Sequence, residues 1–268
     1  LFYSPLLFSL LFFSCQNPSN SVQGDDTHLA PGQKKEPSNP KTSPDPQSIE
    51  EDAAATQLPL KTAQADSFFR DFAAKHDQSV AVIHTDFGDI KVKLYEDTPI
   101  HRGNFLFLAQ RGYFDGTWFY RVREGHVIQA GNNDEMKLQQ ERHDLGAYTL
   151  AAENIQKHHH LRGRLAMARS YENNSAKRSD PFEFYIVVGE SYTPDQLEAM
   201  QEQQDLSLSP KQQKIYARKP GSPHLQGEHT VFGEVLSGMD AVLKINQVPT
   251  DNREWPKQDI PIKVTVRE

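Results

Sequence analysis

The 268-residue sequence contains a single cysteine, Cys15, which excludes an intramolecular disulfide and any zinc site built from several cysteines. Positive charge is also scarce, since 29 Lys and Arg residues are outnumbered by 36 Asp and Glu residues, for a formal net charge of −7. A protein whose main partner is a nucleic acid needs a clustered excess of Lys and Arg, so this balance argues against that class. The length allows one or two domains with a sizeable core.

Motifs of several common enzyme classes are missing as well. The sequence has no G-x-S-x-G, no phosphate-binding G-x-x-x-x-G-K-S/T, no H-E-x-x-H and no G-x-G-x-x-G. Three consecutive histidines at positions 158–160 are the most conspicuous group of metal-binding side chains. Three neighbours in sequence cannot all direct their side chains at one metal from a regular strand or helix, so we interpret this run as a solvated loop.

The longest apolar run is uncharged and covers residues 1–13, directly before Ser14 and Cys15. Its length is typical of a signal peptide and falls short of the roughly 20 residues that a transmembrane helix needs. The run Leu11–Cys15 resembles a bacterial lipobox, in which the cysteine is lipidated. We predict a signal-peptide remnant at 1–14, with its true start missing, and a lipid anchor at Cys15. The alternative is an ordinary secretory signal with an incidental cysteine.

The next segment is poor in apolar residues. Residues 16–67 contain no Phe, Tyr or Trp and seven of the seventeen prolines. Such a segment cannot offset the entropy lost on ordering, so we predict a disordered tether over residues 15–65. Phe68, Phe69 and Phe72 then follow at helical spacing, with Asp66 as the expected N-cap. This pattern predicts a short leading helix within residues 66–79.

The remaining sequence, residues 80–268, has the pattern of many short strands and few helices, which is typical of a barrel or sandwich. Helices are predicted at 98–112 and 239–245. Residues 190–223 are polar and Gln-rich, with Thr193-Pro194 and Ser209-Pro210 as helix starts, so we predict an insertion with two short surface helices. Strands are predicted at 80–84, 90–94, 118–122, 126–130, 164–168, 184–188, 230–235 and 262–266.

The most informative segment reads F-Y-R-V at 119–122 and G-H-V-I-Q-A-G at 125–131. By pattern alone, an Arg in an apolar strand is typical of an edge or salt-bridge residue. The segment resembles the cyclophilin pattern F-H-R-V-x-x-x-F-x-I-Q-G-G. Further matches follow in the family's order at 99–105, 163–168, 184–186 and 229–235. Over residues 80–268 the chain is therefore similar to cyclophilin-type peptidyl-prolyl cis/trans isomerases.

The resemblance implies a mainly β fold, a closed eight-stranded antiparallel barrel capped by two helices, and an isomerase that uses no cofactor or metal. An X-Pro bond rotates over a barrier of about 18–20 kcal/mol, which falls when the prolyl nitrogen loses its amide resonance. In cyclophilins an Arg hydrogen-bonds to that nitrogen, and the matching residue is Arg121. The substrate-holding Gln matches Gln129. Glu183 stands at another Gln position, and we expect it to pair with Arg121 or Arg169.

The resemblance also implies a set of substrate-binding residues, several of which depart from the family pattern. His126 and Tyr185 replace pocket phenylalanines, Arg169 replaces an Asn whose backbone contacts the peptide, and His224 stands at a position that is often Trp or His. Loss of an aromatic contact at His126 would weaken proline binding by about 1–2 kcal/mol. The implied residues are Phe119, His126, Val127, Ala168, Arg169, Glu183, Tyr185, His224, Leu225 and His229.

Two functions are consistent with the sequence. The first is a monomeric isomerase, anchored through Cys15, that assists folding of proline-containing polypeptides in the cell envelope, facing the periplasm at the inner or outer membrane. The second is a low-activity chaperone or binding module for proline-containing segments, with residues 190–223 as its contact surface. Arg121, Gln129 and His229 favour the first function, and the substitutions at His126, Arg169 and Glu183 leave the second open.

Overall fold

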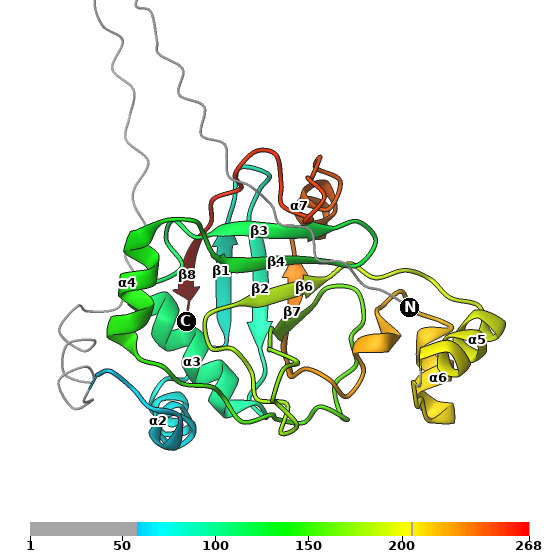
Figure 1. The fold of residues 1–268 in the computed structure, drawn as a ribbon, viewed down its shortest axis with the longest axis horizontal. Coiled ribbons are helices and arrows are strands. Elements are labelled where there is room, and N and C mark those ends of the chain that lie inside the picture. Colours follow the sequence, from blue (N-terminus) through cyan, green and yellow to red (C-terminus); the bar gives the residue numbers. More distant parts are fainter. Residues whose placement is uncertain (1–57, 205, 268) are drawn as a thin grey trace, which may run out of the picture. The chain divides into compact units, whose positions relative to one another are not determined.

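The computed structural model describes residues 58–204 and 206–267. The predicted signal remnant, the lipid anchor at Cys15 and most of the predicted tether lie outside the described residues. The described part is mainly β, with eight strands in one antiparallel sheet (Figure 1). The strands are β1 (Val80–His84), β2 (Ile90–Leu94), β3 (Trp118–Arg123), β4 (Val127–Asn132), β5 (Arg164–Met167), β6 (Phe184–Val187), β7 (Val231–Ser237) and β8 (Lys263–Arg267).

The sheet has the strand order β3-β4-β6-β5-β7-β2-β1-β8, so β3 and β8 form its two edges. The chain just before β8 runs beside β3: the Phe119 N–H donates to the Ile260 carbonyl over 2.9 Å, and the Ile262 N–H donates to the Thr117 carbonyl over 2.8 Å. In the described part no ladder of paired strands joins β3 to β8. The sheet is a curled half-barrel, and the closed barrel implied by the resemblance is not confirmed.

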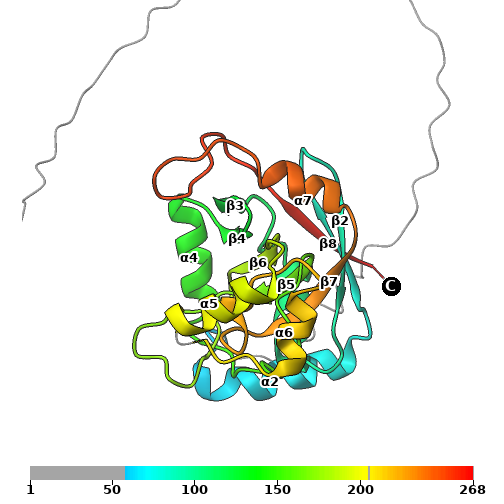
Figure 2. The same ribbon diagram turned by 90° about the vertical axis from the view of Figure 1, so that its right-hand side faces the viewer.

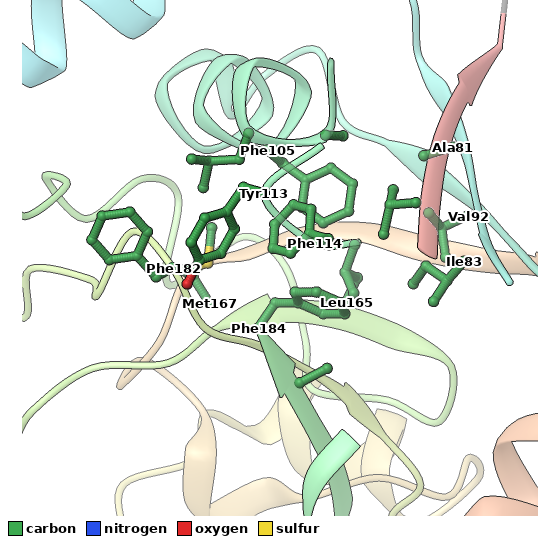
Figure 3. Close-up of a cluster of buried hydrophobic side chains, with 14 of the residues drawn as sticks. Ala81, Ile83, Val92, Phe105, Tyr113, Phe114, Leu165, Met167, Phe182 and Phe184 are labelled. Carbon is green, nitrogen blue, oxygen red and sulfur yellow. The ribbon is translucent and has the colours of Figure 1, made fainter. Parts of the chain in front are cut away.

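Alternation along the strands sorts side chains onto the two faces of the sheet. In β2, Ile90, Val92 and Leu94 are buried while the two intervening lysines are exposed. The buried side chains meet α3 (Pro99–Gln110) in the main core. Figure 3 shows this core, in which the Phe105 ring of α3 and the Phe184 ring of β6 meet edge to face. The predicted first and last residues of the strands lie within two residues of the observed ones.

Helix α2 (Thr62–Lys75) covers α3 from outside. A Cβ at Gly103 would lie 2.0 Å from the Phe69 carbonyl oxygen, so only glycine allows the two helices to approach this closely. The predicted start at Asp66 is wrong, since the helix begins four residues earlier. Asp66 does not cap it, and its carboxylate instead accepts from the Ala151 N–H and pairs with Arg178. The tether prediction also extends too far, because Leu60 is buried in the core.

Helix α4 (Met136–Leu145) was not predicted. Only Leu138 and Leu145 are buried in it, so the segment lacks the apolar stripe by which a helix is recognised in a sequence. Helix α7 (Met239–Ile245) has the predicted bounds. Figure 2 shows α7 beside β2 and β8 and α4 at another side of the sheet.

The two helices predicted in the insertion are α5 (Pro194–Gln204) and α6 (Pro210–Tyr216). A capping box starts α6, in which the Ser209 side chain accepts from the Gln212 N–H. The helices lie side by side in both views (Figures 1 and 2), and Figure 1 shows them across the sheet from α4. They bury Leu197 and Tyr216 in a small cluster separate from the main core. The short 3-10 helix η1 (Pro223–Leu225) leads back towards the sheet.

Candidate active site

A groove of about 430 Å³ opens on the face of the sheet that turns away from α3. Strand alternation creates this face: in β4 and β6, Ile128 and Phe184 join the main core, whereas Val127 and Tyr185 line the groove. The loop between β5 and β6, the turn between β3 and β4, η1 and the residues just before β7 complete the walls. The lining residues are Arg121, Arg123, His126, Val127, Gln129, Ala168, Arg169, Ser170, Tyr171, Asp180, Glu183, Tyr185, His224, Leu225 and His229.

One end of the groove, which we call the histidine end, consists of His126, Val127, Tyr185, Leu225 and His229. Val127, Tyr185 and Leu225 form a small apolar cluster with neighbouring strand residues. The His229 ring lies edge-on to the Tyr185 ring, with centroids 5.4 Å apart. The histidine end is therefore a compact, mostly apolar pocket with imidazole walls.

The imidazoles at the histidine end are neutral near pH 7. Burial lowers the pKa of His126 to about 3, with further contributions from His224 and Arg123. Burial also lowers the pKa of His229 to about 4, although the Met167 carbonyl acts in the opposite direction. Burial and Arg123 also lower the pKa of His224, so the three histidines of the groove do not make it cationic and the pocket remains suitable for an uncharged apolar ring.

The opposite end, which we call the carboxylate end, consists of Gln129, Asp180 and Glu183. Glu183 Oε2 accepts from the Tyr120 hydroxyl over 2.5 Å and from Gln129 Nε2 over 3.2 Å. Glu183 Oε1 lies 3.3 Å from Arg142 Nη2 of α4. A carboxylate thus takes the place of an amide and still holds the Gln129 side chain, because Arg142 supplies the compensating charge.

Arg121 and Arg169 have other carboxylate partners than the one expected. Arg121 Nη2 lies 2.7 Å from Glu254 Oε2, and Arg121 Nη1 donates to Gln129 Oε1 over 3.3 Å. Arg169 is paired with Glu228. The prediction that Glu183 pairs with Arg121 or Arg169 is therefore wrong, because Arg142 occupies the position from which a cation reaches Glu183.

The histidine run at 158–160 is not the solvated loop that the sequence suggested. His158 pairs with Asp97, His159 contacts the Gln226 amide oxygen over 3.0 Å, and His160 is fully buried behind the groove. The ring nitrogens of His160 and the hydroxyl of Tyr185 have no hydrogen-bond partner there. Within residues 58–204 and 206–267, no group of three or more His, Cys, Asp or Glu side chains is arranged to hold a metal ion.

The profile of the family described as "Cyclophilin type peptidyl-prolyl cis-trans isomerase/CLD" matches residues 80–266, which is more than half of the chain. The chain belongs to this cyclophilin family. A solved cyclophilin-type isomerase from Cryptosporidium parvum superposes with a TM-score of 0.51 at 21% identity, covering 71% of this chain and 98% of the other. That likeness supports the cyclophilin fold.

The names of several curated relatives include the words peptidyl-prolyl cis-trans isomerase. A putative isomerase from Staphylococcus aureus is 29% identical over 187 residues, which cover 68% of this chain and 88% of the relative. A putative bifunctional phosphatase/isomerase from Streptococcus pyogenes is 28% identical, covering 70% of this chain and 38% of the relative. An isomerase-like protein from Rhizopus delemar is 29% identical, covering 69% and 28%. The chain thus spans well under half the length of these last two relatives.

Most residues that the cyclophilin resemblance implied lie in the groove. Phe119 does not, and its assignment to the substrate site is wrong: its ring is fully buried in the main core near Phe184. The register between β3 and β4 shifts between Phe119 and Arg121, so these two side chains face opposite sides of the sheet, although regular alternation would place them on the same side. The groove also includes residues that the sequence did not single out, namely Arg123, Ser170, Tyr171 and Asp180. All four lie in or beside loops, where no periodicity assigns a side chain to a face.

Two further groups act from behind the groove and were also missed. Arg142 is on the unpredicted helix α4, and Glu254 lies in the loop before β8. Arg142 Nη2 also donates to the Gly131 carbonyl over 2.8 Å, so its guanidinium is held against β4. Arg142 is far in sequence from Glu183, and Glu254 is far from Arg121. Neither pair could be predicted, because an ion pair has no sequence signature unless its two residues share a helix.

Proposed function

We propose that this cyclophilin catalyses cis/trans isomerisation of X-Pro peptide bonds. The observation that carries the proposal is the position of the Arg121 guanidinium, which is hydrogen-bonded to Gln129 and borders a neutral apolar pocket in the same groove. The side chain of Arg121 is 36% exposed, so its remaining N–H groups are accessible from the groove. This pairing of a charged donor with a pocket for a small ring is what rotation about a prolyl bond requires.

The groove supports a mechanism that uses only the chain's own side chains. The histidine end would hold the prolyl ring and exclude water, and Gln129 would hold the backbone of the residue before it. Arg121 would then donate to the prolyl nitrogen, which removes the amide resonance that keeps the bond planar. One charged donor of this kind contributes about 2.7–4 kcal/mol to transition-state stabilisation, or two to three decades of rate.

Replacement of Arg121 tests the proposal directly. We expect Arg121→Ala to lower kcat/KM on a proline peptide roughly 100- to 1000-fold, measured by a protease-free exchange assay. Arg111→Ala, an exposed arginine at the end of α3 and outside the groove, is the matched control. Equal rates for the Arg121→Ala variant and the unmodified protein would refute the catalytic role.

A second candidate is a binding module with little turnover. It is favoured by the ion pair of Arg121 with Glu254, which engages the guanidinium before any substrate arrives. Both side chains are about one-third exposed, and pairs of this kind contribute about 0–1 kcal/mol, so a substrate can compete for Arg121. Tight binding of a proline peptide without acceleration of its isomerisation would establish the second function.

We also propose that the protein is anchored in the cell envelope through a lipid on Cys15 and assists folding there as a monomer. The support is the sequence alone: the apolar run at 1–13 and the lipobox-like residues before Cys15. None of the described helices is long and apolar enough to cross a membrane. Mass spectrometry of the mature protein would decide, since a chain that begins elsewhere and carries no acyl group contradicts the anchor.

A further inference from the structure

Tyr171 is an exposed aromatic residue on the rim of the groove. It lies in the loop between β5 and β6 and is 61% exposed, although it lines the groove. Few large apolar side chains in the described part of the chain are this exposed. Exposed aromatic residues beside a pocket are common anchors for ligands, because they offer a large contact area with little conformational entropy to lose.

The Tyr171 hydroxyl is held by His229. His229 Nδ1 lies 3.1 Å from the Met167 carbonyl oxygen, which can only accept, so Nδ1 carries the proton of the neutral ring. His229 Nε2 is then an acceptor, and the Tyr171 hydroxyl donates to it over 2.8 Å. The tautomer and the phenol orientation are thus set together.

One face of the Tyr171 ring is covered by a cation. The Arg169 guanidinium lies 4.1 Å from the ring centroid. Arg169 is itself held, because its Nε donates to the Glu228 carbonyl over 2.7 Å and its guanidinium pairs with the Glu228 carboxylate. The ring is therefore fixed at its hydroxyl and on one face, and the large exposed fraction shows that much of the remaining surface is available for contact.

Tyr171 lies on the side of the groove where the residue before a bound proline would be. Its ring centroid is 5.7 Å from that of His229, which forms a wall of the histidine end. Along the chain it follows Ala168 and Arg169, the stretch whose backbone contacts the peptide in the family pattern. The Ala168 N–H bonds to the Glu183 carbonyl, which brings this stretch close to the carboxylate end that would hold the backbone before proline. Tyr171 thus borders the path of the residue that precedes the proline.

We propose that Tyr171 determines specificity, with its ring forming a wall for the side chain that precedes proline and favouring large apolar or aromatic residues there. The inference rests on the proposed function, since it takes X-Pro segments as the occupants of the groove. In the competing explanation the Tyr171 ring contacts no substrate, and Tyr171 affects selectivity only because its hydroxyl orients the His229 ring. The two roles are separable because Phe retains the ring and loses the hydroxyl.

The test compares two peptides that differ only before the proline, one with Phe-Pro and one with Gly-Pro. The measured quantity is the ratio of kcat/KM for the first peptide to that for the second. Tyr171→Ala should lower this ratio roughly three- to tenfold, the range expected for loss of one aromatic contact. Tyr171→Phe should keep the ratio. Leu236→Ala, an exposed apolar residue outside the groove, should also keep it.

Two results would overturn the inference: an unchanged ratio in Tyr171→Ala, or an equal fall in Tyr171→Phe. Circular dichroism of each variant verifies that it is folded. Equilibrium binding of the same peptides separates this inference from the proposed function. Selective binding that depends on the Tyr171 ring, without turnover, would reject the isomerase and keep the role of Tyr171. Turnover with a ratio that does not depend on the ring would do the reverse, and binding of neither peptide would reject both.

Discussion

At the histidine end of the groove His126 and His229 are neutral, whereas at the carboxylate end Glu183 is held beside the guanidinium of Arg142. Burial lowers the pKa values of the two histidines to about 3 and about 4, so these side chains lose their charge. Glu183 is similarly secluded, with a side chain 16% exposed, but it has a cationic partner at 3.3 Å. Buried side chains without an ion-pair partner thus form an uncharged pocket, whereas a partly buried carboxylate with a cationic partner forms a rigid ion pair.

Removal of Arg142 should have the largest effect on the contrast between the two ends, because it takes away the cation that distinguishes the carboxylate end. Arg142→Met leaves the Glu183 carboxylate secluded without its cation, and we expect a loss of about 3 kcal/mol in the free energy of unfolding, measured by urea denaturation. The double variant Arg142→Met/Glu183→Gln should recover part of the loss, because it also removes the unpaired charge. A loss below about 1 kcal/mol in the single variant would show that Tyr120 and Gln129 suffice to stabilise Glu183.

Acidification should affect the two ends in opposite directions. The pKa values of His126 and His229 are lower in the folded protein than their ordinary value of 6.5 in the unfolded chain. Below pH 6.5 the unfolded chain therefore binds protons that the folded protein does not. The contribution of the two histidines to stability is complete above about pH 6.5 and is lost as the pH falls towards 4. At the carboxylate end, burial and the nearby Glu183 raise the pKa of Asp180 from 3.8 to about 6. Asp180 therefore takes up a proton more readily when folded and contributes stability as the pH falls below 6.

Thermal unfolding between pH 7 and pH 4.5 would measure these contributions. Relative to the unmodified protein, His126→Phe should lose less stability on acidification, because one disfavoured protonation is removed. Asp180→Asn should lose more, because a favoured protonation is removed. Parallel pH profiles for all three proteins would contradict the assignment of opposite roles to the two ends.

The smallest effect is expected at the ion pair beside the carboxylate end. Glu254→Ala should raise kcat/KM by less than about fivefold, since the substrate no longer competes with a partly exposed pair worth about 0–1 kcal/mol. Glu124→Ala, an exposed acidic residue outside the groove lining, is the control for a general change in charge. A fall in kcat/KM would instead mean that Glu254 orients Arg121 for catalysis.

Elements with a strong period were predictable from the sequence. The alternation in β2 predicted its observed bounds, since burial of one face leaves a periodic trace in the chain. The bounds predicted for α7 were also observed. Helix α4 left no such trace, because only two of its residues are buried. The start of α2 was misplaced at Asp66 for a related reason: a good capping residue was available, but Asp66 instead accepts from the distant Ala151.

Some residues of the candidate site could likewise be predicted from the sequence and others could not. Arg121 and Gln129 could be named from the sequence because residues 119–131 resemble the cyclophilin pattern, and in the structure the two residues pair on adjacent strands. Their charged environment could not, since Glu254 and Arg142 come from a loop and a helix whose placement depends on packing. The expected partner of Glu183 was wrong for this reason.

The sequence by itself determined the family, through motifs at the family's spacing, and the strand pattern, because burial of one face of a strand leaves a local alternation in the chain. Only the tertiary structure decided which cation accompanies Glu183, which histidines are neutral, and where Tyr171 stands at the rim. Each of these depends on the distance between groups far apart in the chain, and both Coulomb attraction and desolvation are set by that distance and by burial.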